Sequence, residues 1–376
     1  MAIELSSVMF TNRADVVPAS GVEEILNTGI ANTLAGNDKI TGTGTGGRYS
    51  IFNSGTLNTA EGNDIIMGIR SQKEEYPFMG YSAIYNERGT IDTGNGNDLI
   101  TGISEAGIGI QTLYGTINTG NGNDHITGTG FSNGVFINYG GTLDTGRGND
   151  IITANGISGL QNYSTINIGD GNDIITGNGI TTGIYSHGSI DTGDGNDIIT
   201  GIGTESGYGI INTGRGSITF GDGNDIITGI HTGSFGIGLV NGSTCTIDTG
   251  NGNDIITGIG TEYGIRNNGT INTGNGNDSI IADGGLDGSI GNVFLGDGED
   301  YLKGFGSGDF YGGNGNDTLE LTPGSYTVGI WGEGGESVIF TKGNSLMITS
   351  EFEKLIAGGT TYDFTSLTAG QIIIVA

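Results

Sequence analysis

Aspartate recurs along this chain in one fixed, glycine-rich setting, and that setting suits the binding of a cation. Residues 192–200 read TGDGNDIIT, and the strings TGNGNDIIT at 249–257 and FGDGNDIIT at 220–228 repeat the pattern. Each copy has two glycines around one variable residue, followed by asparagine, aspartate and a short aliphatic run. The twelve aspartates that mark the copies are Asp38, Asp64, Asp98, Asp124, Asp150, Asp173, Asp197, Asp225, Asp254, Asp278, Asp300 and Asp317.

The spacing of these marker aspartates predicts a solenoid. Consecutive markers are 26, 34, 26, 26, 23, 24, 28, 29, 24, 22 and 17 residues apart, as expected when each unit forms one coil of a repeat protein. Successive coils of β-structure lie about 4.8 Å apart, so the carboxylates would form a column. Two unit charges about 5 Å apart repel by roughly 0.8 kcal/mol in water and about 3 kcal/mol at an effective dielectric of 20. We therefore expect a cation between neighbouring carboxylates.

The donor atoms of the turn favour calcium. Glycine permits turn conformations that aim carbonyl oxygens inward, and carbonyl oxygens with carboxylates form the all-oxygen cage that suits Ca²⁺. Magnesium prefers to keep its waters, and zinc would need His or Cys, but the three histidines follow no column. Twelve loops have at most eleven gaps, and one Ca²⁺ in each gap would change the net charge from -29 to about -7. The glycines assigned to these sites are Gly94, Gly96, Gly120, Gly122, Gly169, Gly171, Gly193, Gly195, Gly221, Gly223, Gly250, Gly252, Gly274 and Gly276.

The unit resembles the calcium-binding repeat of the RTX (haemolysin-type) family, whose pattern is G-G-x-G-x-D-x-U-x. In the copy at 249–257, Gly250, Gly252, Asp254 and Ile256 occupy the second, fourth, sixth and eighth positions, and Thr249 replaces the first glycine. The resemblance covers about residues 34–321. It implies several bound Ca²⁺ ions. Family members usually repeat the nonapeptide in tandem, with ions on both edges of the coil. In this chain a glycine-asparagine strand pair stands in place of every second nonapeptide, so we expect one ion column.

Short strands must position these loops. The aliphatic residues Ile256, Ile265, Ile271 and Ile280 are 9, 6 and 9 residues apart, and each lies near glycine or asparagine. This pattern predicts about three short strands per coil, joined by tight turns. The asparagine before the marker aspartate is present in eleven of twelve turns, and we expect these amides to stack as a ladder.

The expected fold class is all-β: a parallel β-helix or β-roll solenoid with a C-terminal β-rich cap. We expect residues 1–33 to cap the first coil and residues 34–321 to form the calcium-binding solenoid. In residues 322–376 the repeat stops, and apolar residues such as Tyr326 and Val328 alternate with polar ones, which predicts the C-terminal cap. No helix is expected in the solenoid.

Composition excludes several classes of protein. The chain has 376 residues with 12 basic and 41 acidic side chains, and this balance argues against binding nucleic acid. The sequence contains no run of about 18 consecutive apolar residues, so no membrane span is expected. Cys245 is the only cysteine, so no disulfide framework is expected. Residues 1–24 do not resemble a Sec-type signal peptide.

One insertion interrupts the repeat. Residues 72–86, QKEEYPFMGYSAIYN, contain Tyr76, Phe78, Tyr81 and Tyr85, and insertions in a solenoid loop outward. The loop either folds its aromatic rings back onto the coil, which we favour, or contacts a cell-surface or extracellular partner. End-to-end self-association of the solenoid is a further open alternative.

Three functions compete at this point. The first is a secreted, calcium-binding structural or surface protein, and by the RTX resemblance residues 351–376 would contain an uncleaved type I secretion signal. The second is an adhesive or ice-binding array, although the third position of the turn holds mixed charges such as Arg147 and Asp170, which argue against an ice plane. The third is an enzyme, which we do not expect because no HExxH or GxSxG motif is present.

Overall fold

The structure, a computed structural model, describes residues 2–18, 24–44, 47–71, 80–288, 291–332 and 337–376. The chain divides into two compact units. The first unit comprises residues 1–194 with 199–202, and the second comprises residues 195–198 with 203–376. Each unit is treated separately below.

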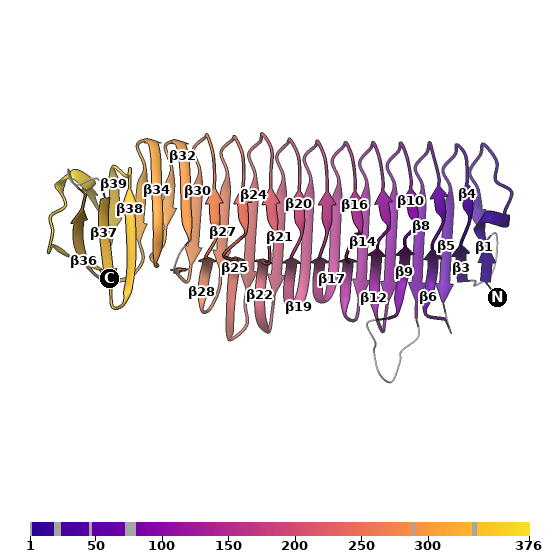
Figure 1. The fold of residues 1–376 in the computed structure, drawn as a ribbon, viewed down its shortest axis with the longest axis horizontal. Helices are drawn as coiled ribbons and strands as arrows, with labels where there is room; N and C mark the ends of the chain where they lie inside the picture. The colour runs from indigo at the N-terminus through magenta and orange to yellow at the C-terminus, as the bar shows by residue number, and fades with distance from the viewer. Residues whose placement is uncertain (1, 19–23, 45–46, 72–79, 289–290, 333–336) are drawn as a thin grey trace. The chain divides into compact units, whose positions relative to one another are not determined.

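Both units are built from coils of three strands, as predicted. In the second unit one coil runs through β27 (Ile255–Ile259), β28 (Tyr263–Asn267) and β29 (Thr270–Asn272), and a glycine-rich turn leads to β30 (Ser279–Asp283) of the next coil. Within each unit these turns lie along one edge, the upper edge of Figure 1. The protein is therefore an all-β parallel solenoid.

The strands of the first unit fall into three series. The first-strand series comprises β2 (Val16–Val17), β5 (Lys39–Gly44), β8 (Ile65–Arg70), β11 (Leu99–Ser104), β14 (His125–Gly130) and the first halves of β17 (Ile151–Asn162) and β19 (Ile174–Ser186). The second-strand series comprises β1 (Ala2–Glu4), β3 (Glu24–Asn27), β6 (Tyr49–Asn53), β9 (Ser82–Glu87), β12 (Ile108–Leu113), β15 (Asn133–Ile137) and the second halves of β17 and β19. The third-strand series comprises β4 (Ile30–Asn32), β7 (Thr56–Asn58), β10 (Thr90–Asp92), β13 (Thr116–Asn118), β16 (Thr142–Asp144), β18 (Thr165–Asn167) and β20 (Ser189–Asp191).

The second unit continues the same plan and ends in a cap. Its coils also contain β22 (Ser206–Asn212), β23 (Ser217–Thr219), β24 (Ile226–His231), β25 (Phe235–Asn241), β26 (Thr246–Asp248), β31 (Leu286–Asp287), β32 (Asn292–Gly298), β33 (Tyr301–Lys303), β34 (Gly308–Gly315) and β35 (Thr318–Leu321). The cap contains β36 (Gly324–Trp331), β37 (Ser337–Lys342), β38 (Ser345–Ser350), β39 (Lys354–Ala357), β40 (Thr360–Asp363) and β41 (Ile372–Val375). β21 (Ile198–Gly203) has residues in each unit.

Parallel, in-register pairing stacks identical residues from coil to coil. Ile100 pairs with Ile126, which pairs with Ile152, and all three side chains are buried. Alternate residues of each strand point inward, so the core consists of stacked aliphatic side chains, mostly isoleucine, from all three strand series. Burying one such side chain stabilises the fold by roughly 1.5–3 kcal/mol. The predicted inward anchors of the β27–β30 coil are likewise buried.

A ladder of buried amides runs beside this core. The side chain of Asn53 accepts a hydrogen bond from Asn27 (2.7 Å) and donates one to Asn86 (2.8 Å). In the second unit Asn241 accepts from Asn212 (3.1 Å) and donates to Asn267 (2.9 Å). These amides close the turns between the second and third strands.

The ends and the insertion differ in detail from the sequence expectation. β3 pairs with β6 and β4 pairs with β7, so the coil ladder includes residues placed before 34. Of the expected 72–86 loop, residues 72–79 lie outside the described residues, and residues 82–86 belong to strand β9. Tyr85 is buried against Tyr49, with ring centroids 4.6 Å apart.

The C-terminal cap is a β-meander. β36 pairs antiparallel with β37 and β41, and β37 pairs antiparallel with β38. Two 3₁₀ turns, η1 (Leu5–Ser7) and η2 (Phe364–Ser366), are the helical segments of the described chain. No helical segment of the described residues has the length and hydrophobicity needed to cross a bilayer.

Candidate metal centre

The marker aspartates form one buried column in each unit. Every one of the twelve side chains is at most 2% exposed, although each lies at a surface turn. The carboxylates therefore point into the stack of turns, on a single edge of the unit. This is the arrangement that the spacing predicted.

One carboxylate oxygen of each aspartate is used in holding the stack together. The backbone N–H of Asp98 donates to Oδ1 of Asp124 (2.8 Å), and the N–H of Asp124 donates to Oδ1 of Asp150 (2.7 Å). In the second unit, the N–H of Asp254 donates to Oδ1 of Asp278 (2.8 Å). Each Oδ1 thus satisfies the N–H of the marker aspartate in the preceding coil.

Residues outside the sequence pattern continue the column at its ends. The N–H of Asp15 donates to Oδ1 of Asp38 (2.8 Å), and the N–H of Asp317 donates to Oε2 of Glu353 (2.7 Å). Glu353 takes the place of a marker aspartate, but no glycine turn precedes it. The repeat pattern therefore gives no signal for Glu353.

The second carboxylate oxygen has no hydrogen-bond donor in most of these turns. The buried Oδ2 atoms without a partner among the described residues belong to Asp38, Asp64, Asp98, Asp124, Asp150, Asp225, Asp254, Asp278, Asp300 and Asp317. A buried threonine lies near several of these carboxyl groups and lowers their pKa, as Thr93 does for Asp98. The Thr93 hydroxyl also donates to the carbonyl of Thr119 (3.2 Å). Buried polar atoms normally have a hydrogen-bond partner. A repeated row of buried carboxylate oxygens without one therefore requires a physical explanation.

Burial alters the acidity of these carboxyl groups. It raises the pKa of Asp98 and Asp124 to about 6 and that of Asp225 and Asp278 to about 7. The hydrogen bond from the neighbouring N–H opposes this shift, and repulsion between successive aspartates is a smaller cause than burial. The spacing of the repeat predicts repulsion between stacked carboxylates. In the structure, the loss of solvation of each carboxylate is the larger cost of ionisation.

The paired glycines are required by the closeness of the turns. Gly94 and Gly96 have φ values of 87° and 152°. A Cβ atom at Gly96 would lie 1.5 Å from the carbonyl oxygen of Gly62 in the preceding coil. The carbonyl of the second glycine therefore points along the stack into the next turn, where only glycine fits.

The two glycine carbonyls have different roles. The carbonyl of Gly94 accepts the N–H of Asn121 (3.1 Å) and so belongs to the backbone ladder. A carbonyl oxygen has two lone pairs, so the Gly94 oxygen keeps one lone pair free to accept a further bond. The Gly96 carbonyl faces the following turn. A Cβ added at Gly171 or Gly223 would lie 3.1 or 3.3 Å from Oδ1 of the marker aspartate in the same turn, so these predicted glycines lie beside the marker carboxylates.

These donor atoms fit a hard cation. The described residues contain no group of three or more His, Cys, Asp or Glu side chains that could hold a metal ion, so a cation between the turns would have to be bound largely by backbone carbonyls and water beside the carboxylates. Carboxylate Oδ2 atoms and backbone carbonyls are oxygen donors, which Ca²⁺ accepts in variable number and geometry. A divalent ion would also remove the cost of burying an unpaired carboxylate.

The outer surface of the turns carries two further ladders. The side chain of Asn97 accepts the backbone N–H of Asn123 (2.7 Å), and Asn123 in turn accepts that of Asn149 (2.8 Å). The asparagines before the marker aspartates thus form a ladder from turn to turn. The variable residue between the glycines forms the second ladder, in which Asn121 donates to Asn95 (2.7 Å). Both rows are structural.

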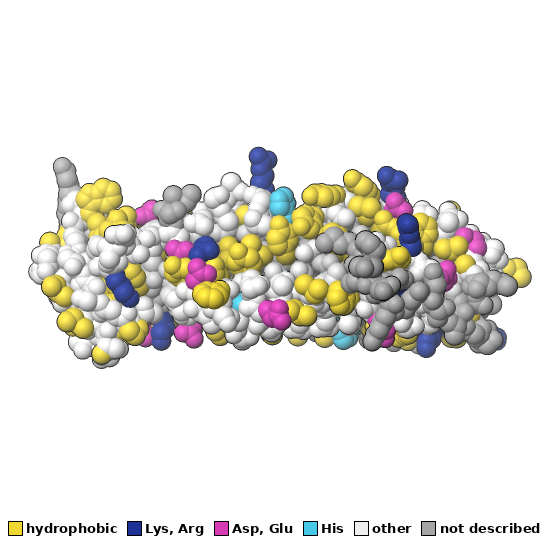
Figure 2. Space-filling model, turned by 90° about the horizontal axis from the view of Figure 1, so that it is seen from below, with side chains coloured by type: hydrophobic (Ala, Val, Ile, Leu, Met, Phe, Trp, Pro, Cys, Tyr) yellow, Lys and Arg dark blue, Asp and Glu magenta, His cyan; other side chains and the backbone are white. Residues whose placement is uncertain are grey.

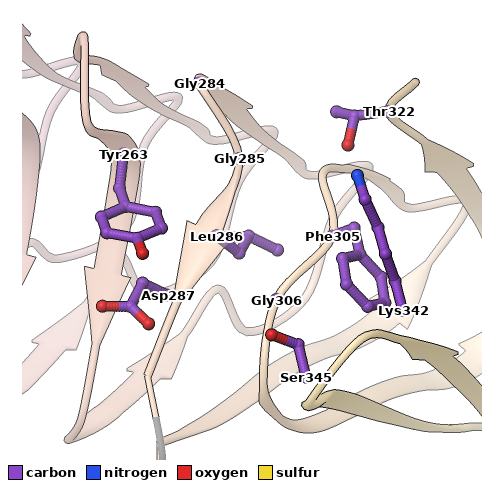
Figure 3. A pocket seen from close by; sticks show the side chains of 10 residues that line it. All are labelled: Tyr263, Gly284, Gly285, Leu286, Asp287, Phe305, Gly306, Thr322, Lys342 and Ser345. Carbon is purple, nitrogen blue, oxygen red and sulfur yellow. The ribbon is translucent and has the colours of Figure 1, made fainter. Parts of the chain in front are cut away.

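A separate cleft of about 240 Å³ lies in the second unit, where β31 is only two residues long. Figure 3 shows Tyr263 and Asp287 on one side and Phe305 and Lys342 on the other. Its charged groups are already satisfied. Asp287 pairs with Arg266 (2.6 Å), and Nζ of Lys342 donates to the carbonyl of Pro323 (2.8 Å).

The fold and the column define a β-solenoid protein with stacked acidic turns. No protein-family model and no curated protein matches the chain. A similar solved structure is the X-ray crystal structure of a hyperactive, Ca²⁺-dependent, β-helical antifreeze protein from an Antarctic bacterium. The match has a TM-score of 0.51 and 19% sequence identity, and it covers 96% of this chain and 93% of that chain. This likeness supports the solenoid fold.

Proposed function

We propose that this protein is a calcium-stabilised structural or surface protein whose coils are held together by Ca²⁺ ions between successive turns. The row of buried Oδ2 atoms without a donor carries this proposal. In the absence of a cation, each ionised carboxylate is buried with only Oδ1 holding a backbone N–H, and the uncompensated charge is unfavourable. The bound ion would supply positive charge at these oxygens.

Two further observations support calcium. The solved β-helical neighbour is described as Ca²⁺-dependent, and the turn resembles the RTX repeat. In keeping with that resemblance, we propose that the protein is secreted and that residues 351–376 contain the type I export signal. Its role on this proposal is structural, without catalysis.

Calcium would couple binding to folding. The coils are narrow, and each contains few buried aliphatic residues, while ordering a coil of about 24 residues costs roughly 36 kcal/mol at about 1.5 kcal/mol per residue. A chain stripped of metal is therefore expected to lose much of its ordered structure.

Far-ultraviolet circular dichroism during a calcium titration of metal-free protein tests the proposal. Strand signal should rise with added calcium and should respond much less to magnesium at the same concentration. Complete strand signal before calcium is added, together with an unchanged unfolding temperature after its addition, contradicts the proposal.

A second candidate function, ice binding, is favoured by the outer face of the first-strand series. Thr228 pairs in register with Thr257, and the isoleucines on either side also pair in register. In the first unit Thr101, Thr127 and Thr153 pair in the same way. In these coils the row consists of uncharged threonine side chains, unlike the mixed charges of the turn, and a regular row of hydroxyls could order water.

Ice-crystal shaping and thermal hysteresis test this candidate. Thr127→Lys would place a bulky charge in the middle of the threonine row of the first unit, and it should abolish activity if that face contacts ice. Arg147→Lys, in the charged row of the turn, is the control and should have no effect. Activity that survives the Thr127 change excludes this face.

A further inference from the structure

The C-terminal cap closes the marker column with residues that lie outside the repeat. Strand β38 pairs in parallel with β34, and β39 pairs in parallel with β35. The N–H groups of Glu353 and Lys354 donate to the carbonyl of Asp317 (3.1 and 2.9 Å), and the Asp317 N–H donates to Oε2 of Glu353 (2.7 Å). The segment that joins β38 to β39 is thus held directly against the last marker aspartate.

The last glycine turn differs from the others at its first position, five residues before the marker aspartate. Threonine occupies this position in eight of the twelve turns, and Gly312 is the one glycine. Where threonine is present, it lies beside the carboxylate and holds the next coil. The hydroxyl of Thr273, for example, lies beside Asp278 and donates to the carbonyl of Leu295 (2.8 Å). Gly312 has no hydroxyl, so the last turn lacks this donor.

The carbonyl of Glu351 enters the space that a first-position side chain would need. A Cβ added at Gly312 would lie 1.8 Å from the Glu351 carbonyl oxygen and 2.9 Å from Oδ2 of Asp317. Both oxygens therefore border one small space. The Asp317 side chain is fully buried, and its Oδ2 has no hydrogen-bond donor among the described residues. Two acceptors thus meet where most turns have a hydroxyl.

Further negative charge surrounds this space. Burial raises the pKa of Asp317 to about 6, and repulsion from Asp300, Glu353 and Glu351 adds to the increase. The ion pairs of the described residues involve other acidic groups. On the edge opposite the glycine turns, which Figure 2 shows, acidic side chains are scattered among hydrophobic and uncharged ones. The charge beside Asp317 is therefore a local feature of the last turn.

A cation satisfies this arrangement better than a water molecule does. Water could donate to both acceptors, but it would leave the buried carboxylate charge uncompensated. Ca²⁺ accepts carbonyl and carboxylate oxygens, and its affinity rises with the number of charged groups at the site. Since the described residues hold no group of three or more acidic, His or Cys side chains that could bind a metal ion, water would complete the coordination shell.

We infer that Oδ2 of Asp317 and the carbonyl of Glu351 bind a Ca²⁺ ion that joins the cap to the solenoid, and that the charge of Glu353 makes this the tightest cation site of the column. The inference rests on the proposed function, because it concerns one ion of the same row. This site differs from those between the coils because it takes a ligand from outside the repeat. The cap therefore becomes ordered at calcium concentrations that leave most of the inner sites empty.

A calcium titration of the metal-free full-length protein tests the order of filling. Equilibrium dialysis counts the ions bound at each free calcium concentration. Trp331, the only tryptophan of the chain, lies in β36 of the cap, so its fluorescence anisotropy reports the ordering of the cap. Far-ultraviolet circular dichroism reports the coils. The anisotropy should reach its final value when a single ion is bound, before circular dichroism does.

Variants identify the ligands. Glu353→Gln keeps an oxygen that accepts the Asp317 N–H but removes the charge, so it should weaken binding of the first ion about tenfold. Asp317→Asn should weaken it further. Asp363→Asn removes a charge from an exposed position of the same cap and should leave the first ion unchanged. Circular dichroism at saturating calcium establishes that each variant is folded.

The possible failures are distinguishable. A parent protein that binds no calcium overturns the proposed function and this inference together. A parent that binds several ions, but whose Trp331 anisotropy changes in step with circular dichroism, overturns this inference alone. The same conclusion follows if Glu353→Gln and Asp317→Asn bind the first ion as tightly as Asp363→Asn does. If a variant does not fold, the measurement on the parent decides.

Discussion

At the scale of single residues, the marker aspartate has two oxygens with different tasks. Oδ1 of Asp124 holds the N–H of Asp98, and Oδ2 of Asp124 lies buried without a donor. The first task needs only an acceptor, which an amide also supplies. The second needs a cation or a proton. A change from aspartate to asparagine therefore separates the two tasks.

We predict that Asp124→Asn stabilises the metal-free protein and weakens its response to calcium. At pH 7.5 the amide removes a buried charge, so the metal-free unfolding free energy should rise by about 1–3 kcal/mol. The increase in unfolding temperature on adding calcium should be smaller than in the parent protein. Calorimetry with and without calcium measures both effects.

Asp363→Asn is the matched control, because Asp363 is an exposed aspartate of β40 in the cap, away from the marker column. It should change neither quantity appreciably. Equal responses of the two variants would show that the marker column has no special relation to calcium.

The second glycine of the turn admits no side chain. Gly96→Ala would place a methyl group 1.5 Å from the Gly62 carbonyl and would also force alanine into φ of 152°. We expect a loss of more than about 4 kcal/mol of stability, or failure to fold. Gly80→Ala, with open space around the added atom, should be nearly neutral in the same denaturant titration.

At the scale of the strands and turns, the buried asparagine ladder joins one coil to the next. Nδ2 of Asn241 donates to Oδ1 of Asn267 and to the carbonyl of Thr270, each at 2.9 Å. We predict that Asn241→Ala lowers the unfolding free energy by about 2–4 kcal/mol, because it leaves buried partners unsatisfied. Urea unfolding measures the change.

The same substitution on the outer surface provides the comparison. Asn118 of β13 donates to Asp92 at 3.1 Å but is part-buried, and water can replace it. Asn118→Ala should cost less than about 1 kcal/mol. A loss at Asn241 no larger than at Asn118 would mean that the inner ladder adds little to stability.

At the scale of the whole molecule, the raised carboxyl pKa values link folding to pH. In the unfolded chain these groups titrate near 3.9, whereas burial raises the pKa of Asp64, Asp98, Asp150 and Asp317 to about 6. Between these values the folded protein holds protons that the unfolded chain has released. Stability of the metal-free protein therefore falls as pH rises through this window.

We predict that the unfolding temperature of protein stripped of metal on a chelating resin decreases between pH 5 and pH 7.5. This range avoids the isoelectric point of about 4.1, where precipitation would interfere. Added calcium should have little effect at pH 5, where protons occupy the column, and a large effect at pH 7.5. An unfolding temperature that rises with pH in the absence of metal would show that the carboxylates are compensated by other groups.

The sequence by itself determined the coil and the column. The paired glycines, the marker aspartates and the isoleucines recur once per coil, and a residue with that period must stack on its own copy in a parallel solenoid. The predicted three strands per coil, the buried isoleucines and the single edge of carboxylates followed from this periodicity. The asparagine ladder of the turns followed in the same way.

Only the tertiary structure decided features that depend on residues outside the period. Glu353 continues the column without a glycine turn. Tyr85 packs against Tyr49, in keeping with the favoured expectation that the aromatic rings fold back, but it does so from strand β9 and not from a loop. The rings of Tyr139, Tyr163 and His187 pack together because turns of unequal sequence come to lie on neighbouring coils. The period determines which residues stack, whereas the depth of the turn determines how much water reaches them. Solvent exclusion, more than mutual repulsion, therefore governs the carboxylates.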